Sequence, residues 1–185
     1  MIQFIKTRNV KNPERLAGEN AGIDFFIPEN TPEFIEALKI KNPNLEVIDE
    51  DPNSVLFILN KTSYITKADG VIHIAPHHDI IIPTGIKSKF DANLALIANN
   101  KSGIATKKKL IFGASVIDNS YQGEWHAHMI NWSDEFQTIT CGQKIIQFIP
   151  HYISTDPIEV VDCDEDTFYT SVTSRGEGWA GSTGV

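Results

Sequence analysis

The amino-acid sequence predicts a mainly-β domain, a sandwich or a barrel, and three observations support this. Short apolar or alternating runs recur along the chain at intervals of about 8–12 residues, which is typical of such folds. These runs are rich in β-branched and aromatic residues, and proline and glycine separate them. The 185 residues, 41% of them hydrophobic, can bury one sizeable core, so we expect a single domain.

The first predicted strand is Met1–Ile5, where apolar and polar residues alternate in a way unlike the long apolar stretch of a signal peptide. The other predicted strands share short length and flanking turn residues. In chain order they are Ile23–Ile27, Val55–Leu59, Val71–Ile74, Ile80–Pro83, Leu94–Ala98, Leu110–Phe112, Trp125–Ile130, Lys144–Pro150 and Ile158–Val161.

One short helix is predicted after Thr31, which suits the N-cap, with Pro32 at the first helical position. Phe34 and Leu38 then fall on one apolar stripe, and Asn42 before a proline ends the helix. We interpret residues 29–70 as an insertion on the β framework, made of this helix, an acidic loop from Asp49 to Pro52 and an extra pair of strands.

Composition and charge limit the partners. The net charge of −8 and the pI near 5.2 argue against nucleic acid and against an anionic membrane surface. No run approaches the ~18 apolar residues that span a bilayer. Cys141 and Cys163 have neither metal-binding nor disulfide-framework spacing, so we expect reduced thiols and a cytoplasmic location, or the host cytoplasm if the chain is viral.

The last eleven residues, 175–185, combine four glycines with an arginine, a serine and a threonine. Guanidinium, hydroxyl and unhindered backbone N–H groups are what a polyphosphate needs. We interpret residues 171–185 as a mobile C-terminal arm that orders over a phosphorylated ligand, after a single domain at 1–170. The alternative is an ordinary disordered tail.

Asp118 follows an apolar run and precedes a turn, and Tyr121 lies just after it. Strands on both sides of this turn would form a hairpin with both side chains at its end. A carboxylate there can orient a water and take its proton, and an aromatic ring can pack on a sugar. The alternative role for Asp118 is that of a turn-capping residue.

Two further segments suit a polar ligand. Lys101, Ser102 and Gly103 offer a cation, a hydroxyl and a flexible backbone for phosphate, although the segment does not match the P-loop pattern. Gln147 is a single amide among apolar neighbours, either a satisfied core group or a ligand contact. His126 and His128 would share one strand face, but no third metal ligand is evident.

Five ordered segments together resemble the motifs of the homotrimeric dUTPases. They are Ala21-Gly22-Ile23-Asp24, Lys101-Ser102-Gly103-Ile104-Ala105, Val116-Ile117-Asp118 with Tyr121 and Gly123-Glu124, Gly142 through Gln147, and Arg175-Gly176 with Ser182-Thr183-Gly184. The resemblance implies a jelly-roll-like distorted β-barrel assembled as a homotrimer, with active sites between subunits. It also implies hydrolysis of dUTP to dUMP and diphosphate, with Mg²⁺ held by the substrate phosphates and by no direct protein ligand.

Carried over from the family, Asp118 is the catalytic residue that positions water at the α-phosphorus, and Asp24 supports the polar network. Tyr121 packs under the deoxyribose and excludes a 2′-hydroxyl. The other implied substrate contacts are the phosphate-binding Lys101, Ser102, Gly103 and Gln147, the uracil-reading backbone of Gly113, Val116 and Ile117, and the arm residues Arg175, Ser182 and Thr183.

The chain departs from the family pattern at three points. Lys101 stands where the family has arginine, so charge is kept without the bidentate geometry. Trp179-Ala180 replaces Gly-Phe, so Trp179 is the expected stacking residue over uracil. The stretch before Asp118 lacks the usual asparagine. Two alternatives therefore stay open: a dCTP deaminase or bifunctional dCTP/dUTP enzyme, and a weakly active dUTPase-like regulatory protein that binds a partner through the insertion.

Overall fold

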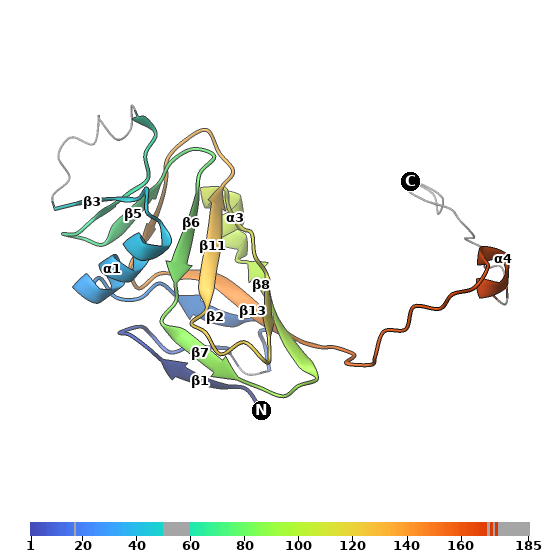
Figure 1. The fold of residues 1–185 in the computed structure, drawn as a ribbon. Helices are drawn as coiled ribbons and strands as arrows, with labels where there is room; N and C mark the ends of the chain where they lie inside the picture. The colour runs from blue at the N-terminus through green and yellow to red at the C-terminus, as the bar shows by residue number, and fades with distance from the viewer. Residues whose placement is uncertain (17, 50–59, 170, 172, 174–185) are drawn as a thin grey trace. The chain divides into compact units, whose positions relative to one another are not determined.

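The computed structural model describes residues 1–16, 18–49, 60–169, 171 and 173. The chain forms two compact units, Met1–Ser154 and Thr155–Val185. All strands of the described residues belong to the first unit (Figure 1). The predicted strand Val55–Leu59, most of the acidic loop and nearly all of the predicted arm at 171–185 lie outside the described residues.

The first unit is built from four small sheets, as a mainly-β prediction requires. One four-stranded sheet has the order β10 (Val116–Asp118), β8 (Leu94–Asn100), β13 (Lys144–Tyr152), β2 (Ile23–Phe26). A three-stranded sheet has the order β6 (Asp79–Pro83), β11 (His126–Asn131), β9 (Leu110–Phe112). The remaining sheets are β12 (Gln137–Thr140), β5 (Val71–Ile74), β4 (Tyr64–Thr66), β3 (Glu46–Ile48), and the pair β1 (Gln3–Lys6) with β7 (Ile86–Lys89).

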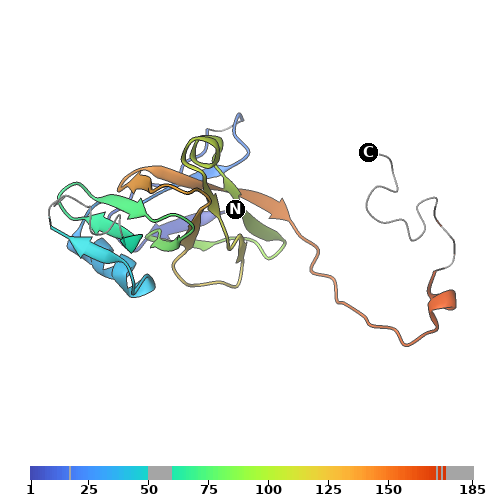
Figure 2. The same cartoon turned by 90° about the horizontal axis from the view of Figure 1, so that it is seen from above.

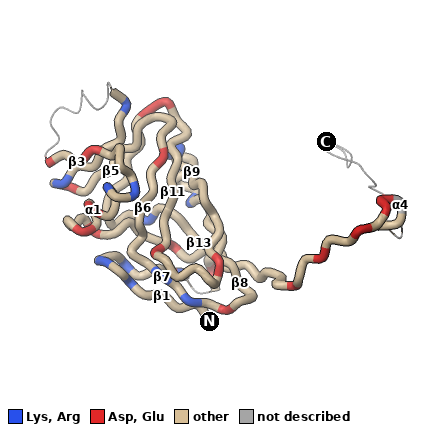
Figure 3. Tube along the Cα trace, in the orientation of Figure 1, with Lys and Arg blue, Asp and Glu red and all other residues tan. Residues whose placement is uncertain are grey.

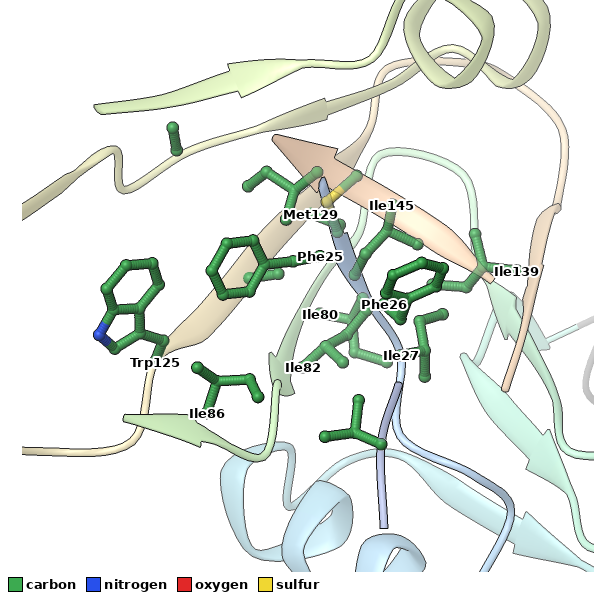
Figure 4. Packing of buried hydrophobic residues seen from close by; sticks show 14 of the residues in the cluster. Phe25, Phe26, Ile27, Ile80, Ile82, Ile86, Trp125, Met129, Ile139 and Ile145 are labelled. Carbon is green, nitrogen blue, oxygen red and sulfur yellow. The ribbon is translucent and has the colours of Figure 1, made fainter. Parts of the chain in front are cut away.

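The core lies between the β2–β13 and β6–β11 strands (Figure 4). Strand β11 buries Ala127 and Met129 while His126 and His128 stay partly exposed, which is the alternation predicted for this run. Trp125, just before β11, is fully buried and stacks on Phe25 at a ring separation of 5.0 Å. These long-range contacts connect strands from both halves of the first unit.

The predicted helix is confirmed as α1 (Pro32–Lys41). Thr31 accepts a hydrogen bond from the Phe34 N–H at 3.3 Å, and Phe34 and Leu38 are fully buried. The side chain of Asn42 both donates to and accepts from the Ile81 backbone, each at 2.8 Å. The residue that ends the helix therefore also attaches it to β6, beside the strands β3 and β5 (Figures 1 and 2).

Among the described residues, two helices besides α1 were not predicted, so the expectation of a single short helix is wrong. Helix α3 (Ser102–Lys108) occupies the segment expected to be a flexible loop, because Ile104 is buried beneath it. Helix α4 (Glu165–Phe168) lies in the second unit, directly after Asp164.

The predicted strand Ile158–Val161 is also wrong. Ile158 is 95% exposed, and no strand among the described residues pairs with this run. Alternation alone does not make a strand without a partner ladder. From residue 155 to residue 169 the sequence has acidic residues and no lysine or arginine (Figure 3), and all side chains described there are exposed.

The predicted hairpin through Asp118 is wrong as well. Strand β10 pairs with β8, with Asp118 opposite Ala95, whereas β11 pairs with β6 and β9. Residues 118–121 form a turn, in which the Tyr121 N–H donates to the Asp118 carbonyl at 3.1 Å.

Among the helices that the structure describes, none has the length and apolar run that crossing a bilayer requires.

Candidate active site

A cavity of about 510 Å³ lies at one end of the β8–β13–β2 sheet and collects five of the predicted site residues: Asp24, Lys101, Ser102, Gly103 and Gln147. The strand register explains the arrangement, because Gln147 pairs with Asp24 on one side and with Asn99 on the other. Lys101 directly follows the end of β8. The start of α3 and the segment before β2 complete the walls.

Asp24 is the electrostatic centre of this cavity and is only 8% exposed. Its Oδ1 lies 2.5 Å from Lys101 Nζ, and its Oδ2 lies 3.2 Å from Lys144 Nζ. Two ammonium groups therefore compensate one buried carboxylate, as a buried charge requires. Lys144 is a cavity residue to which the sequence analysis gave no role.

Gln147 is oriented by two features. Its Nε2 donates to the Asn100 carbonyl at 3.0 Å, and its half-buried side chain lines the cavity. A Cβ at Gly22 would lie 2.4 Å from Gln147 Oε1, so only glycine allows this close approach. The glycine of the first motif thus shapes the position of the glutamine in the fourth.

Ser102 and Gly103 form the first turn of α3, and both are exposed. No atom comes within 4 Å of the position that a Cβ on Gly103 would take, so a ligand has room there. The first backbone N–H groups of a helix have no partner within the helix. The arrangement suits the oxygens of a phosphate chain.

The second group of predicted residues lies around β10. The Asp118 side chain is exposed, as is Val116, while Ile117 is half-buried. The Tyr121 hydroxyl donates to the Glu124 carbonyl at 2.9 Å, and its ring covers Gly123, where a Cβ would lie 2.4 Å from the hydroxyl oxygen. Tyr121 remains 41% exposed, so its outer face is available to a ligand.

The two groups do not meet within one chain. Asp118 is opposite Ala95 near the start of β8, and Lys101 follows the end of that strand, six residues further on. At about 3.3 Å per residue, the two positions are separated by about 20 Å along the strand. The two groups therefore lie at opposite ends of β8.

Glu124, the last residue of the third motif, has a structural partner that sequence reasoning missed. Arg8 binds its carboxylate through two hydrogen bonds, Nε to Oε1 at 3.0 Å and Nη2 to Oε2 at 2.5 Å. The Gly85 N–H donates to the same Oε1 at 2.6 Å. Burial raises the pKa of Glu124, but the bonds from Arg8 and Gly85 outweigh it and hold the pKa below the usual value. No local signal links residues 8 and 124.

Gly113 lies against His128 of β11. A Cβ on Gly113 would lie 2.2 Å from His128 Nδ1, and His128 Nε2 lies 2.7 Å from Asp79 Oδ2. His126 is partly buried, and burial lowers its pKa. Within the described residues, no three His, Cys, Asp or Glu side chains form a group that could hold a metal ion.

The predicted substrate-binding residues of the arm, Arg175, Trp179, Ser182 and Thr183, lie outside the described residues.

The mainly-β fold, the cation-rich cavity and the exposed Asp–Tyr turn define a nucleotide diphosphatase. The chain belongs to the dUTPase family, whose family model, described as dUTPase, matches residues 65–184. The resemblance seen in the five motifs is thereby confirmed. The activity is hydrolysis of dUTP.

Similar proteins agree with this assignment. A deoxyuridine 5'-triphosphate nucleotidohydrolase of Picosynechococcus is 33% identical over 116 residues, which are 62% of this chain and 78% of the relative. A mitochondrial nucleotidohydrolase of the same name from Dictyostelium discoideum is 29% identical over 80% of this chain and 83% of its own length. The dUTPase of Staphylococcus bacteriophage 80alpha with dUpNHpp superimposes with a TM-score of 0.69 at 18% identity, covering 100% of this chain and 99% of the phage protein.

Proposed function

We propose that each active site for dUTP hydrolysis is assembled between chains of a homotrimer. One chain supplies the cavity with Lys101 and Gln147, and another supplies the Asp118–Tyr121 turn. The observation that carries this proposal is the separation of about 20 Å along β8, which is several times the reach of a side chain. A nucleotide that contacts both groups therefore needs them from different copies.

In this arrangement the cavity binds the phosphate chain. Lys101 supplies positive charge, Ser102 and Gly103 supply the hydroxyl and N–H donors at the start of α3, and Gln147 supplies an amide held by Asn100. Phosphoryl transfer depends on in-line positioning and charge neutralisation more than on covalent catalysis. A polar cavity of fixed geometry meets that need.

Asp118 is the catalytic residue in this proposal. Its exposed carboxylate orients a water molecule and accepts its proton as the water attacks the α-phosphorus. Tyr121 packs under the deoxyribose, where its ring leaves no room for a 2′-hydroxyl. The backbone of Gly113, Val116 and Ile117 reads uracil.

Mg²⁺ fits the donors present. Among the described residues, two carboxylates line the phosphate cavity, the buried Asp24 and the exposed Glu19. Mg²⁺ usually binds one or two carboxylates together with substrate phosphates and retains several waters. Asp24 would support such a hydrated ion, which supplies charge neutralisation on the triphosphate when bound.

The C-terminal arm completes the site. Arg175, Ser182 and Thr183 would hold the γ-phosphate, and Trp179 would stack over uracil. Closure of the arm excludes water and strengthens the polar contacts to the substrate.

Mixed oligomers test the assembly. Asp118→Asn and Lys101→Met each disable one half of the site, so each variant alone should be inactive. After co-refolding in equal amounts, about a quarter of the sites should contain both intact halves if they come from different chains. Mixtures that stay inactive while mixed oligomers are present would contradict the proposal. Sedimentation should independently give about three times the chain mass of 20.6 kDa.

A further inference from the structure

An alternating row of charges runs into the phosphate cavity: Glu14, Lys144, Asp24 and Lys101. Lys144 Nζ bridges the Glu14 carboxylate and Asp24 Oδ2, the latter at 3.2 Å, while Lys101 Nζ lies 2.5 Å from Asp24 Oδ1. Asp24 is 8% exposed, whereas Lys144 is 39% exposed. The row is neutral overall before any ligand enters.

Phosphate binding disturbs this balance. Lys101 is the cation next to Ser102 and Gly103, so a phosphate chain in the cavity competes with Asp24 for its ammonium group. If Lys101 were the only partner, Asp24 would be left as a buried, uncompensated carboxylate beside a polyanion. Such an arrangement is strongly unfavourable, because a buried charge needs a partner and like charges repel.

We propose that Lys144 is a positioning residue that compensates the Asp24 carboxylate and holds it in place when Lys101 turns to the phosphate chain of the nucleotide. This inference rests on the proposed phosphate role of the cavity. It assigns to Lys144 an effect that acts through Asp24 and that depends on the length of the phosphate chain.

Lys144 is itself held in place. Its partner Glu14 is fixed to Asp24 by two backbone hydrogen bonds, of 3.1 and 2.7 Å. Its ammonium also lies 5.5 Å from the centre of the Phe26 ring, within the range of a cation–π contact. The hydrogen bonds that Lys144 donates to Glu14 and then to Asp24 raise the pKa of Lys144, so its side chain stays charged.

The backbone supports the same assignment. Along a regular strand, Lys144 and Gln147 would face opposite sides of the sheet, because side chains alternate. The pairing of β13 with β2 shifts by one residue between Lys144 and Ile146. This bulge buries Ile145 and Ile146 in succession and lets both Lys144 and Gln147 line the cavity.

The test compares Lys144→Met with Lys11→Met. Lys11 Nζ lies 5.4 Å from the same Phe26 ring and donates to the Gly142 carbonyl, whereas the described ion pairs of Asp24 are with Lys101 and Lys144. Binding of dUpNHpp and of dUMP is measured by calorimetry, with and without Mg²⁺. Lys144→Met should weaken dUpNHpp binding by about 10- to 100-fold and change dUMP binding little. A loss of this size is typical when a residue that holds a binding-site group in place is removed. Lys11→Met should change both by less than about twofold.

Two further variants separate positioning from general packing. Lys144→Arg should restore most of the dUpNHpp affinity, because it keeps the charge. In an Asp24→Asn background, Lys144→Met should add little, since no carboxylate remains to be held. An equal loss for dUMP and dUpNHpp, or an undiminished effect in the Asp24→Asn background, would overturn the inference.

The outcome also distinguishes this inference from the proposed function. If Lys101→Met weakens dUpNHpp binding while Lys144→Met does not, the phosphate cavity stands and the role of Lys144 is refuted. If Lys101→Met itself leaves dUpNHpp binding unchanged, the proposed phosphate site fails, and the inference fails with it. Thermal unfolding of each variant verifies that the compared proteins are folded.

Discussion

Arg8→Met tests how strongly the N-terminal segment is tied to the third motif. Arg8 and Glu124 are 18% and 17% exposed and are joined by two hydrogen bonds. Removing Arg8 leaves the carboxylate with the Gly85 N–H as its remaining described donor. Loss of one partner of a buried pair costs about 3–5 kcal/mol, and an exposed pair is worth about 0–1 kcal/mol. This pair lies between the two cases, so we expect a loss of about 2–3 kcal/mol.

The assay is urea unfolding followed by tryptophan fluorescence at fixed protein concentration, because Trp125 is fully buried in the core. The matched control is Asp49→Asn, which removes an ion pair of 2.6 Å with Lys67 at side chains 82% and 47% exposed. This control should change the free energy of unfolding by less than about 0.5 kcal/mol. A loss for Arg8→Met as small as that of the control would refute the reasoning.

The pH dependence gives a second readout of the same pair. The pKa of Glu124 is lower in the folded chain than its ordinary value of 4.5. The stabilisation is therefore present above about 4.5 and is lost as the pH falls through the folded pKa. The difference in unfolding free energy between the original chain and Arg8→Met should be largest near neutral pH and shrink in acid. A difference that stays constant down to the acid range would contradict this assignment.

Three other predictions concern single sites. Gly22→Ala should displace Gln147 and lower kcat/KM for dUTP by about 10- to 100-fold with the fold intact, and unchanged kinetics would exclude this coupling. Tyr121→Ala should raise turnover of UTP relative to dUTP by about tenfold or more, whereas an unchanged ratio argues against sugar packing. At pH 8 a disulfide reagent should label Cys163, which is exposed, much faster than Cys141, whose pKa burial raises to about 12. Cys163→Ser should remove the fast phase, and a fast phase that persists would contradict it.

Sequence reasoning succeeded where the signals are local. Helix α1 was predictable because Thr31 and Pro32 mark its start and an apolar stripe marks its buried face. Helix α3 was not, because Ser102 and Gly103 are poor helix formers and the helix depends on burial of Ile104 against distant residues. In such a short helix, tertiary packing outweighs the intrinsic helix propensity of the residues.

For the strands too, local patterns predict the segment but not its pairing partner. The run Val116–Asp118 was predictable as part of a β segment, but its pairing with β8 rather than β11 depends on contacts that no local pattern reports. The gathering of Asp24, Lys101 and Gln147 was expected only through the family resemblance. Lys144 escaped attention because regular alternation directs it away from Gln147, and the Arg8–Glu124 pair joins segments 116 residues apart.

The register shift in β13 has a consequence for how this strand tolerates change. Strand β13 forms a wall of the core. Its extra residue shifts the alternation of side chains, so Lys144 and Gln147, although three residues apart, both line the phosphate cavity. Deleting Ile145 would remove the bulge and give a regular ladder, in which Lys144 and Gln147 stand two positions apart and still share one face. One residue added between Ile146 and Gln147 would instead place Lys144 and Gln147 on opposite faces, so this insertion should abolish activity although the β framework can still form.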